Sequence, residues 1–198
     1  PGQTEFYARR FGRKEKEVTM CMVGPRLRVA LASTHVSLRR AVSGLSVSSI
    51  VRAGMHLTEL LKRMGLKKPS IAVCGLNPHA GERGLFGRED IRIVWPAVRR
   101  LKRRTRLPVF GPEPADTVFR RAMNGEFDGV VALYHDQGLI PAKLLDFDRT
   151  VNVTMGLPIV RCSPDHGTAF AIAGKGEARP DSMIEAIRLA ARLAKKSR

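Results

Sequence analysis

Cysteine, acidic side chains and long apolar runs are all scarce in this sequence of 198 residues. Cys21, Cys74 and Cys162 lie far apart without a CxxC pair, which argues against a disulfide framework or a cysteine zinc site, so we expect core thiols. No apolar run reaches the roughly 18 residues that cross a bilayer, and the first residues do not resemble a signal peptide. These absences predict a soluble, cytoplasmic protein that has no contact with a membrane.

The shortage of acidic residues leaves a formal net charge of +17, from 35 Lys and Arg against 18 Asp and Glu. The densest basic run, residues 98–106, continues an apolar pattern of helical period. One face of that pattern holds Ile91, Val94, Trp95, Val98 and Leu101, and the other holds Arg88, Arg92, Arg99 and Arg103. A solvated helix face explains this better than a nucleic-acid-binding patch, because no aromatic residues interleave with the basic ones. The charge would still attract phosphorylated small molecules.

Apolar periodicity predicts alternating strands and helices. Residues 17–23 and 27–33 read as a hairpin around Gly24-Pro25, and a helix from Val47 ends at Gly65. Further strands are expected at residues 70–76, 107–110 and 128–134, with two more around Gly156. A last helix begins near Asp181, with these side chains expected inward: Met183, Ile184, Ile187, Ala191 and Ala194. The alternation predicts a three-layer α/β/α domain with a mixed, mostly parallel sheet.

Two of the predicted strands, residues 70–76 and 128–134, each lead into a loop that carries a histidine. His79 follows the first strand and His135 follows the second. Ligands of such sheets gather beyond the carboxyl ends of the strands, and neutral imidazole is a common ligand of divalent transition metals. Either histidine alone would more often be a hydrogen-bonded loop residue. Two at equivalent strand ends, each beside a carboxylate, make a metal site a real alternative.

Other polar residues of this region leave more than one interpretation open. Lys143 and Arg161 would supply cations for a phosphate or carboxylate, or would simply be surface charge. Asp116 and Asp136 would act as acid or base, or would cap the helices that follow them. Spacing alone does not separate these possibilities.

Glycines mark the segment between residues 165 and 176. Gly167, Gly174 and Gly176 permit close approach of the backbone to a cofactor. The pattern is not the GxGxxG of dinucleotide-binding folds, and a glycine-rich turn is weak evidence by itself.

Taken in order, several segments resemble the 4-hydroxythreonine-4-phosphate dehydrogenase family, NAD-dependent enzymes of vitamin B6 biosynthesis. They are PGQTEFYA, LRVALASTHVSLR, VCGLNPHAGERGLFG, GPEPADTVF, ALYHDQGLIPAKLLDF and VNVTMGLPIVRCSPDHGTAFAIAGKG, followed by the terminal helix. NPHAGE and YHDQG are the most specific of these. The DHGTAxxxAGKG tail is also similar to the cofactor loop of isocitrate and isopropylmalate dehydrogenases, which implies that fold.

The resemblance implies a role for particular residues. His79 and His135 would bind a divalent cation (Zn, Co, Mn or Mg) in a site shared between the subunits of a homodimer. Asp116 and Asp136 would be catalytic, and Lys143, Asn152 and Arg161 would bind the phosphorylated substrate. NAD would contact His166, Gly167, Thr168 and Gly174. The implied reaction oxidises 4-phosphohydroxy-L-threonine, whose product loses CO2 to give 3-amino-2-oxopropyl phosphate on the way to pyridoxal 5'-phosphate.

The chain departs from the family pattern in two places. The family's first metal ligand is the histidine of GHTE, where this sequence has Gln3, whose amide oxygen is a poorer ligand than imidazole. The chain also begins at that motif, so residues 1–198 are expected to be the C-terminal part of the enzyme, without the family's N-terminal segment. These departures keep alternatives open: a degenerate, non-catalytic relative, or an enzyme for another phosphorylated hydroxy acid.

Overall fold

A computed structural model describes residues 3–165, 167 and 169–195 of the chain. The strands are β1 (Thr19–Val23), β2 (Arg28–Leu31), β3 (Ile71–Cys74), β4 (Val109–Glu113), β5 (Gly129–Ala132), β6 (Val151–Met155) and β7 (Cys162–Pro164). The α-helices are α1 (Gln3–Arg10), α2 (Leu38–Ser43), α3 (Val47–Arg63), α4 (Trp95–Thr105), α5 (Ala115–Met123), α6 (His135–Asp146) and α7 (Asp181–Lys195). Short helical turns are η1 (Glu15–Glu17), η2 (Pro78–Gly84), η3 (Asp90–Val94) and η4 (Phe170–Ile172).

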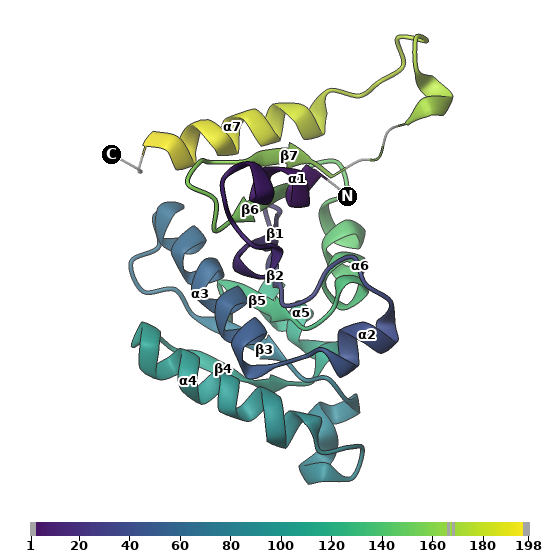
Figure 1. The fold of residues 1–198 in the computed structure, drawn as a ribbon. Coiled ribbons are helices and arrows are strands. Elements are labelled where there is room, and N and C mark those ends of the chain that lie inside the picture. Colours follow the sequence, from purple (N-terminus) through teal and green to yellow (C-terminus); the bar gives the residue numbers. More distant parts are fainter. Residues whose placement is uncertain (1–2, 166, 168, 196–198) are drawn as a thin grey trace.

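The strands form one mixed sheet in the order β4-β3-β5-β2-β1-β6-β7. The pairs β4–β3, β3–β5 and β5–β2 are parallel, whereas β2–β1, β1–β6 and β6–β7 are antiparallel. The predicted mixed α/β architecture is therefore confirmed, with parallel pairing confined to one half of the sheet. The predicted hairpin of residues 17–33 is β1 and β2 (Figure 1).

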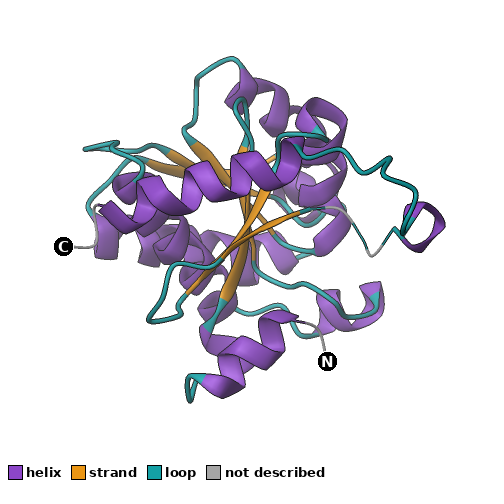
Figure 2. Ribbon diagram, turned by 90° about the horizontal axis from the view of Figure 1, so that it is seen from above, coloured by secondary structure: helices purple, strands orange, loops and turns teal. Residues whose placement is uncertain are grey.

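Helices cover both faces of this sheet, which makes three layers (Figure 2). A Cβ at Gly129 would meet Leu57 of α3, whereas a Cβ at Gly138 of α6 would meet Val29 of β2. Val29 is in register with Val130, and successive residues of a strand point to opposite faces. Gly129 and Val29 therefore lie on opposite faces, so α3 and α6 cover opposite sides of the sheet.

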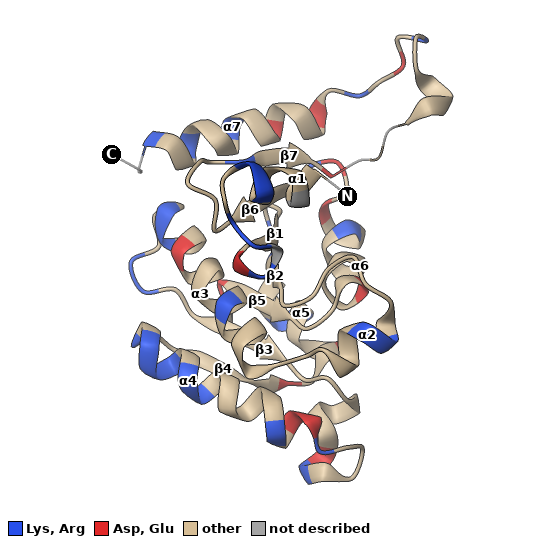
Figure 3. Cartoon of the chain, viewed as in Figure 1, with Lys and Arg blue, Asp and Glu red and all other residues tan. Residues whose placement is uncertain are grey.

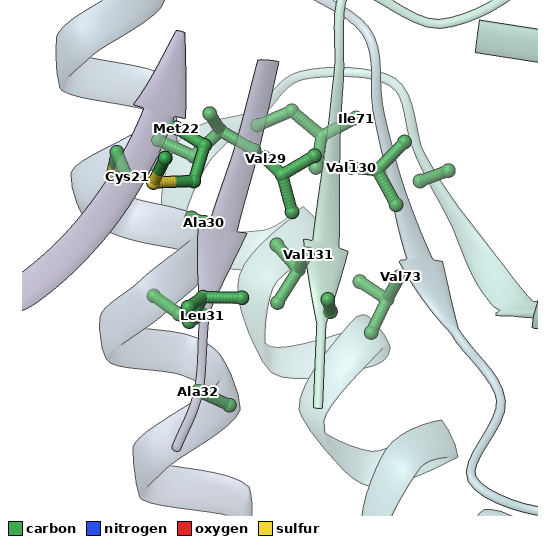
Figure 4. Packing of buried hydrophobic residues seen from close by; sticks show 14 of the residues in the cluster. Cys21, Met22, Val29, Ala30, Leu31, Ala32, Ile71, Val73, Val130 and Val131 are labelled. Carbon is green, nitrogen blue, oxygen red and sulfur yellow. The ribbon is translucent and has the colours of Figure 1, made fainter. Parts of the chain in front are cut away.

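The core consists mainly of aliphatic side chains, with some Met, Phe and Cys, from the central strands and the helices that cover them (Figure 4). Strands β1, β3 and β5 are buried along their whole length, and full burial explains the continuous apolar sequences of β3 and β5. All three cysteines are free thiols; Cys21 and Cys74 are buried in the core, as expected, whereas Cys162 is only half-buried. Burial raises the pKa of the Cys21 and Cys74 thiols, and it raises the pKa of Cys162 to about 11.

Local signals fix the ends of α3. Ser46 and Ser49 form a capping box at its start, because each side chain accepts from the other's backbone N–H. Gly65, where the sequence predicts the helix to end, has a φ of 110° just after the last turn. That left-handed conformation is inexpensive only for glycine.

The buried face of α7 differs from the prediction. Met183, Ile184 and Ile187 are 47%, 39% and 61% exposed. Ser182, Ala186 and Leu193 are the buried residues, and α7 packs on β6 and β7 through this stripe. The expected face was wrong because apolar residues occur on both sides of the helix, and the small residues allow the closer approach to the sheet.

The apolar face predicted for residues 91–101 is only partly confirmed. Val94, Val98 and Leu101 are buried as predicted, but Ile91 and Trp95 are about half exposed, at 46% and 50%. Residues 90–94 form a π-helical turn that precedes α4 and changes the phase of the helical pattern. No helix in the described part of the chain is both long and apolar enough to span a membrane.

Candidate active site

The two histidine loops leave the same edge of the sheet from neighbouring strands. β3 and β5 are parallel and paired in register from Ile71 with Gly129 to Val73 with Val131. Gln137 joins the two loops, because its Nε2 donates to the Gly75 carbonyl (2.9 Å) and its Oε1 accepts from the Leu133 amide (2.7 Å). Gln137, the glutamine of HDQG, thus holds the loop after β5 against the loop after β3. No local sequence pattern predicts this role.

His135 is the first residue of α6, three residues after the end of β5. Its Nδ1 lies 2.6 Å from Oδ1 of Asp136, an arrangement that fixes the ring and leaves Nε2 as the nitrogen able to bind a ligand. The ring of His35, which follows β2, lies 5.5 Å from the His135 ring, centroid to centroid. His35 was not among the predicted residues, although it too follows a strand of the parallel half.

His79 begins a run of left-handed backbone. Residues 79–83 all have φ between 40° and 80°, and four of the five are not glycine, which is costly for residues with a Cβ. The exposed His79 ring lies 6.1 Å from the Phe86 ring. A loop of this kind persists only where surrounding contacts hold it.

Asp90 supplies those contacts. Its carboxylate is 0% exposed and accepts from the backbone amides of Leu76 (2.7 Å) and Asn77 (3.0 Å) and from the Asn77 side chain (3.0 Å). A buried carboxylate that accepts several N–H groups is a strong organising element. Asp90 therefore determines where the NPHAGE loop leaves β3.

Asp116 and Asp136 both lie in the first turn of their helices. The N-cap residues are Pro114 and Tyr134, and neither helix start has a side-chain cap hydrogen bond. The capping alternative is therefore excluded, although both carboxylates still complement the positive end of a helix dipole. Asp116 is exposed, and α5 contacts the turn η2 that carries His79.

Arg161 connects the start of the chain to β6. It is 9% exposed, and its guanidinium donates to Thr154 Oγ1 (2.9 Å) and Gln3 Oε1 (2.9 Å). Thr4 Oγ1 is a longer third contact at 3.4 Å, and the Tyr7 ring lies 5.8 Å away. The amide oxygen of Gln3, at the expected third metal-ligand position, is thus already engaged by Arg161.

Asn152 and Lys143 lie along the same strand region as Arg161. Asn152 and Thr154 are two residues apart on β6, so they point to one face, and Asn152 is in register with Ser163 of β7. Lys143 of α6 pairs with Asp165 just beyond β7 (3.2 Å). Within the described residues the buried Oδ1 of Asn152 has no hydrogen-bond partner. An orphaned buried acceptor of this kind suits a ligand that brings a donor.

Two of the expected cofactor residues, Gly167 and Gly174, are exposed and lie in the segment between β7 and α7 (Figure 1). His166 and Thr168 fall outside the described residues. Gly174 has a φ of 77°, and a Cβ placed there or at Gly167 would meet no atom within 4 Å. The backbone here is open to close approach by a ligand, as a cofactor turn requires.

The donor chemistry near the sheet edge fits a divalent metal only in part. His79 and His135 are suitable ligands with suitable support, but Gln3 is a weak third. Across the described ranges, no three or more His, Cys, Asp or Glu side chains gather as a metal site requires. A complete site would need a ligand from elsewhere.

Residues 1–190 match the family model described as pyridoxal phosphate biosynthetic protein PdxA. The chain belongs to the PdxA family. It is 47% identical over 205 aligned residues to a 4-hydroxythreonine-4-phosphate dehydrogenase of Caulobacter vibrioides, which covers 98% of this chain and 60% of that protein. It is also 49% identical to a D-threonate 4-phosphate dehydrogenase of Cupriavidus necator, over 98% of this chain and 58% of the relative.

A solved PdxA-family structure agrees with the fold. The 4-hydroxythreonine-4-phosphate dehydrogenase of Klebsiella pneumoniae superimposes with a TM-score of 0.86 at 46% identity, over 98% of this chain and 58% of that one. The isocitrate dehydrogenase-like fold expected from the cofactor loop is therefore confirmed. The chain spans about 60% of the length of these relatives.

Proposed function

We propose that this chain carries the metal and phosphate-binding residues of an NAD-dependent dehydrogenase that oxidises and decarboxylates 4-phosphohydroxy-L-threonine in pyridoxal 5'-phosphate biosynthesis. Its membership of a family whose named relatives are dehydrogenases of phosphorylated hydroxy acids supports this. The observation that carries the proposal is that Arg161, Asn152 and Lys143 are linked to one another through β6 and β7, with Lys143 on the helix that begins at His135.

Substrate binding would use two cations, Arg161 and Lys143, and the buried oxygen of Asn152 that is unpaired among the described residues. Arg161, held by Thr154, would present its planar guanidinium to the phosphate. Lys143 would exchange its half-buried ion pair with Asp165 for the same phosphate. The buried oxygen of Asn152 would accept from a hydroxyl or ammonium group of the substrate. Such fixed contacts orient the reacting carbon, and orientation contributes several kcal/mol to rate enhancement.

His79 and His135 would hold the divalent metal, with Asp136 orienting His135 through Nδ1. When bound, the metal would act as a Lewis acid on the substrate hydroxyl, and NAD would accept the hydride. Asp116, exposed on the helix beside the His79 turn, would take the hydroxyl proton. The open turn at Gly167 and Gly174, with His166 and Thr168, would bind NAD.

A homodimer with a shared site would complete the ligand set. Within the described residues one chain alone lacks a cluster of three ligand side chains. Leu85 and Phe86, beside His79, are 74% and 46% exposed, as interface residues would be in a separated subunit. We therefore propose that a second copy packs on the His79 loop and brings the missing ligand.

A second candidate function is the oxidation of D-threonate 4-phosphate. The Cupriavidus relative carries that name at 49% identity, the same as that of one 4-hydroxythreonine-4-phosphate dehydrogenase and close to that of others. Both substrates carry a phosphate and a neighbouring hydroxyl, so the residues proposed above would serve either one.

Titration with Co(II) tests the metal half of the proposal. The d–d absorption of bound cobalt should saturate with the wild-type chain, and His135→Ala should abolish the band. Gln3→His should bind roughly 10-fold or more tightly, because an imidazole replaces an amide that is occupied by Arg161. An unchanged band in His135→Ala would place the metal elsewhere, whereas a band in Gln3→His alone would favour a relative that has lost its metal.

A further inference from the structure

A wide groove lies between α3, α4 and the end of α7, and none of the candidate active-site residues lines it. Its volume is about 1120 Å³. Helices α3 and α4 cover the sheet face opposite α6, which carries His135 and Lys143. The groove is therefore a separate surface from the site described above.

Basic side chains dominate the groove. Six of its twelve lining residues are Lys or Arg, against 35 of 198 in the whole chain, a nearly threefold enrichment. They are Arg52, Lys62, Arg63, Arg100, Arg104 and Lys195. Glu59 is the one acid among these lining residues, and it already pairs with Arg63. The groove thus concentrates positive charge beyond what the composition of the chain explains.

Three helix ends bring these charges together. Lys62 and Arg63 lie in the last turn of α3, Arg104 in the last turn of α4, and Lys195 in the last turn of α7. Figure 3 shows Lys and Arg at these ends of α3, α4 and α7, on the same side of the view. Cations at a helix C-terminus complement the helix dipole. That effect explains basic residues at each helix end, but it does not explain why three such ends line the same groove. Like charges held at close quarters repel, and an anion between them would relieve the repulsion.

Arg52 and His56 form the other end of the groove and are held rigidly. Arg52 donates to the carbonyls of Lys16 (2.9 Å) and Ala32 (2.7 Å), and His56 Nδ1 contacts Thr19 Oγ1 (2.8 Å). By contrast, no hydrogen bond or ion pair of the described residues engages the side chains of Arg100, Arg104 or Lys62. These three cations are available to a ligand.

From this arrangement we propose that the groove binds a small anion that carries several phosphate groups in a row, such as a polyphosphate or the phosphate chain of a nucleotide. Arg100 and Arg104, both on α4, are suited to bind phosphate, because one guanidinium can donate two N–H bonds to the oxygens of a phosphate group. The volume exceeds the need of a single phosphate and suits a ligand of nucleotide size. The lining residues include no Phe, Tyr or Trp on which bases of a nucleic acid would stack, so phosphate groups are the recognised chemistry.

Thermal unfolding of the full chain with inorganic tripolyphosphate tests this proposal, at fixed ionic strength. A ligand that binds only the folded state raises Tm by an amount that grows with the logarithm of its concentration relative to Kd. Tripolyphosphate should raise the Tm of the wild-type chain, and Arg100→Gln/Arg104→Gln should lose at least half of that shift. The matched control is Arg99→Gln/Arg103→Gln, which removes the same charge from α4 outside the groove. This control should keep the shift.

Equal losses in the two double variants would overturn the proposal, because they would show attraction to overall charge alone. The absence of any shift in the wild-type chain would also overturn it. ATP binding at least as strong as that of tripolyphosphate would support a nucleotide as the occupant, and weaker ATP binding would support a polyphosphate. A single-stranded oligonucleotide that binds while both small anions fail would contradict the proposal. Because no active-site residue is changed, these outcomes are independent of the dehydrogenase function.

Discussion

Asp90→Ala is expected to destabilise the chain by on the order of 3 kcal/mol and to disorder the His79 loop. The substitution leaves two backbone amides and the Asn77 side chain without their buried acceptor, and each unsatisfied buried donor costs roughly 1–3 kcal/mol. The left-handed residues 79–83 would then relax toward ordinary backbone conformations. Urea unfolding, followed by circular dichroism, measures the loss of stability.

Glu89→Ala provides the control for that experiment. Glu89 is the neighbouring acid and also accepts from Asn77, at 2.9 Å. Its own backbone amide, and then this contact with Asn77, lower the pKa of Glu89. Its carboxylate is far more accessible to water than that of Asp90, so its removal should cost much less. Similar losses in the two variants would mean that the Asn77 side chain, rather than the buried carboxylate, holds the loop.

Arg161→Lys is expected to weaken binding of 4-phosphohydroxy-L-threonine by about 10- to 100-fold. A lysine keeps the charge but not the planar fork that reaches Thr154 and a phosphate together, and a hydrogen bond to a charged group contributes roughly 1.5–3 kcal/mol. Isothermal titration with the phosphorylated substrate, and with its unphosphorylated counterpart, measures the change. The unphosphorylated compound should bind weakly to both proteins.

Arg10→Lys, at the exposed end of α1, is the matched exchange, and it should leave binding unchanged. Thr154→Val separates positioning from charge, because it removes the acceptor that orients Arg161 and keeps the guanidinium. It should produce an intermediate loss. If Arg161→Lys binds the phosphorylated compound as well as the wild-type chain does, Arg161 is not the phosphate ligand.

The sequence predicted the framework of the fold because its signals are local. The Gly24-Pro25 turn, the apolar runs of β3 and β5, and Gly65 after α3 each depend on neighbouring residues, and the structure confirms them. The buried face of α7 was mispredicted, since it depends on which side of the helix meets β6 and β7. Packing against a distant element cannot be deduced from helical periodicity when both sides are apolar.

The candidate site was found from the sequence only in part, for a similar reason. His79 and His135 are recognisable because each follows a buried strand, and their loops do leave neighbouring strands. Asp90 and Gln137 position those loops by hydrogen bonds to backbone groups 14 and 62 residues away in the sequence. A backbone group has no residue-specific signal that a sequence pattern could detect. Their partners become visible only once the chain is folded. The hydrogen bond between Arg161 and Gln3 joins residues 158 positions apart, so it too cannot be predicted from local sequence patterns.

Formation of NADH by the purified chain is the most direct test of the proposed dehydrogenase. The assay would contain NAD, Co(II) or Mn(II), and either 4-phosphohydroxy-L-threonine or D-threonate 4-phosphate, with His135→Ala as the control. The proposal predicts metal-dependent NADH from at least one substrate and a loss of about 100-fold or more in the variant, since metal ligands are essential to Lewis-acid catalysis. A folded chain that binds metal and substrate but forms no NADH would contradict it.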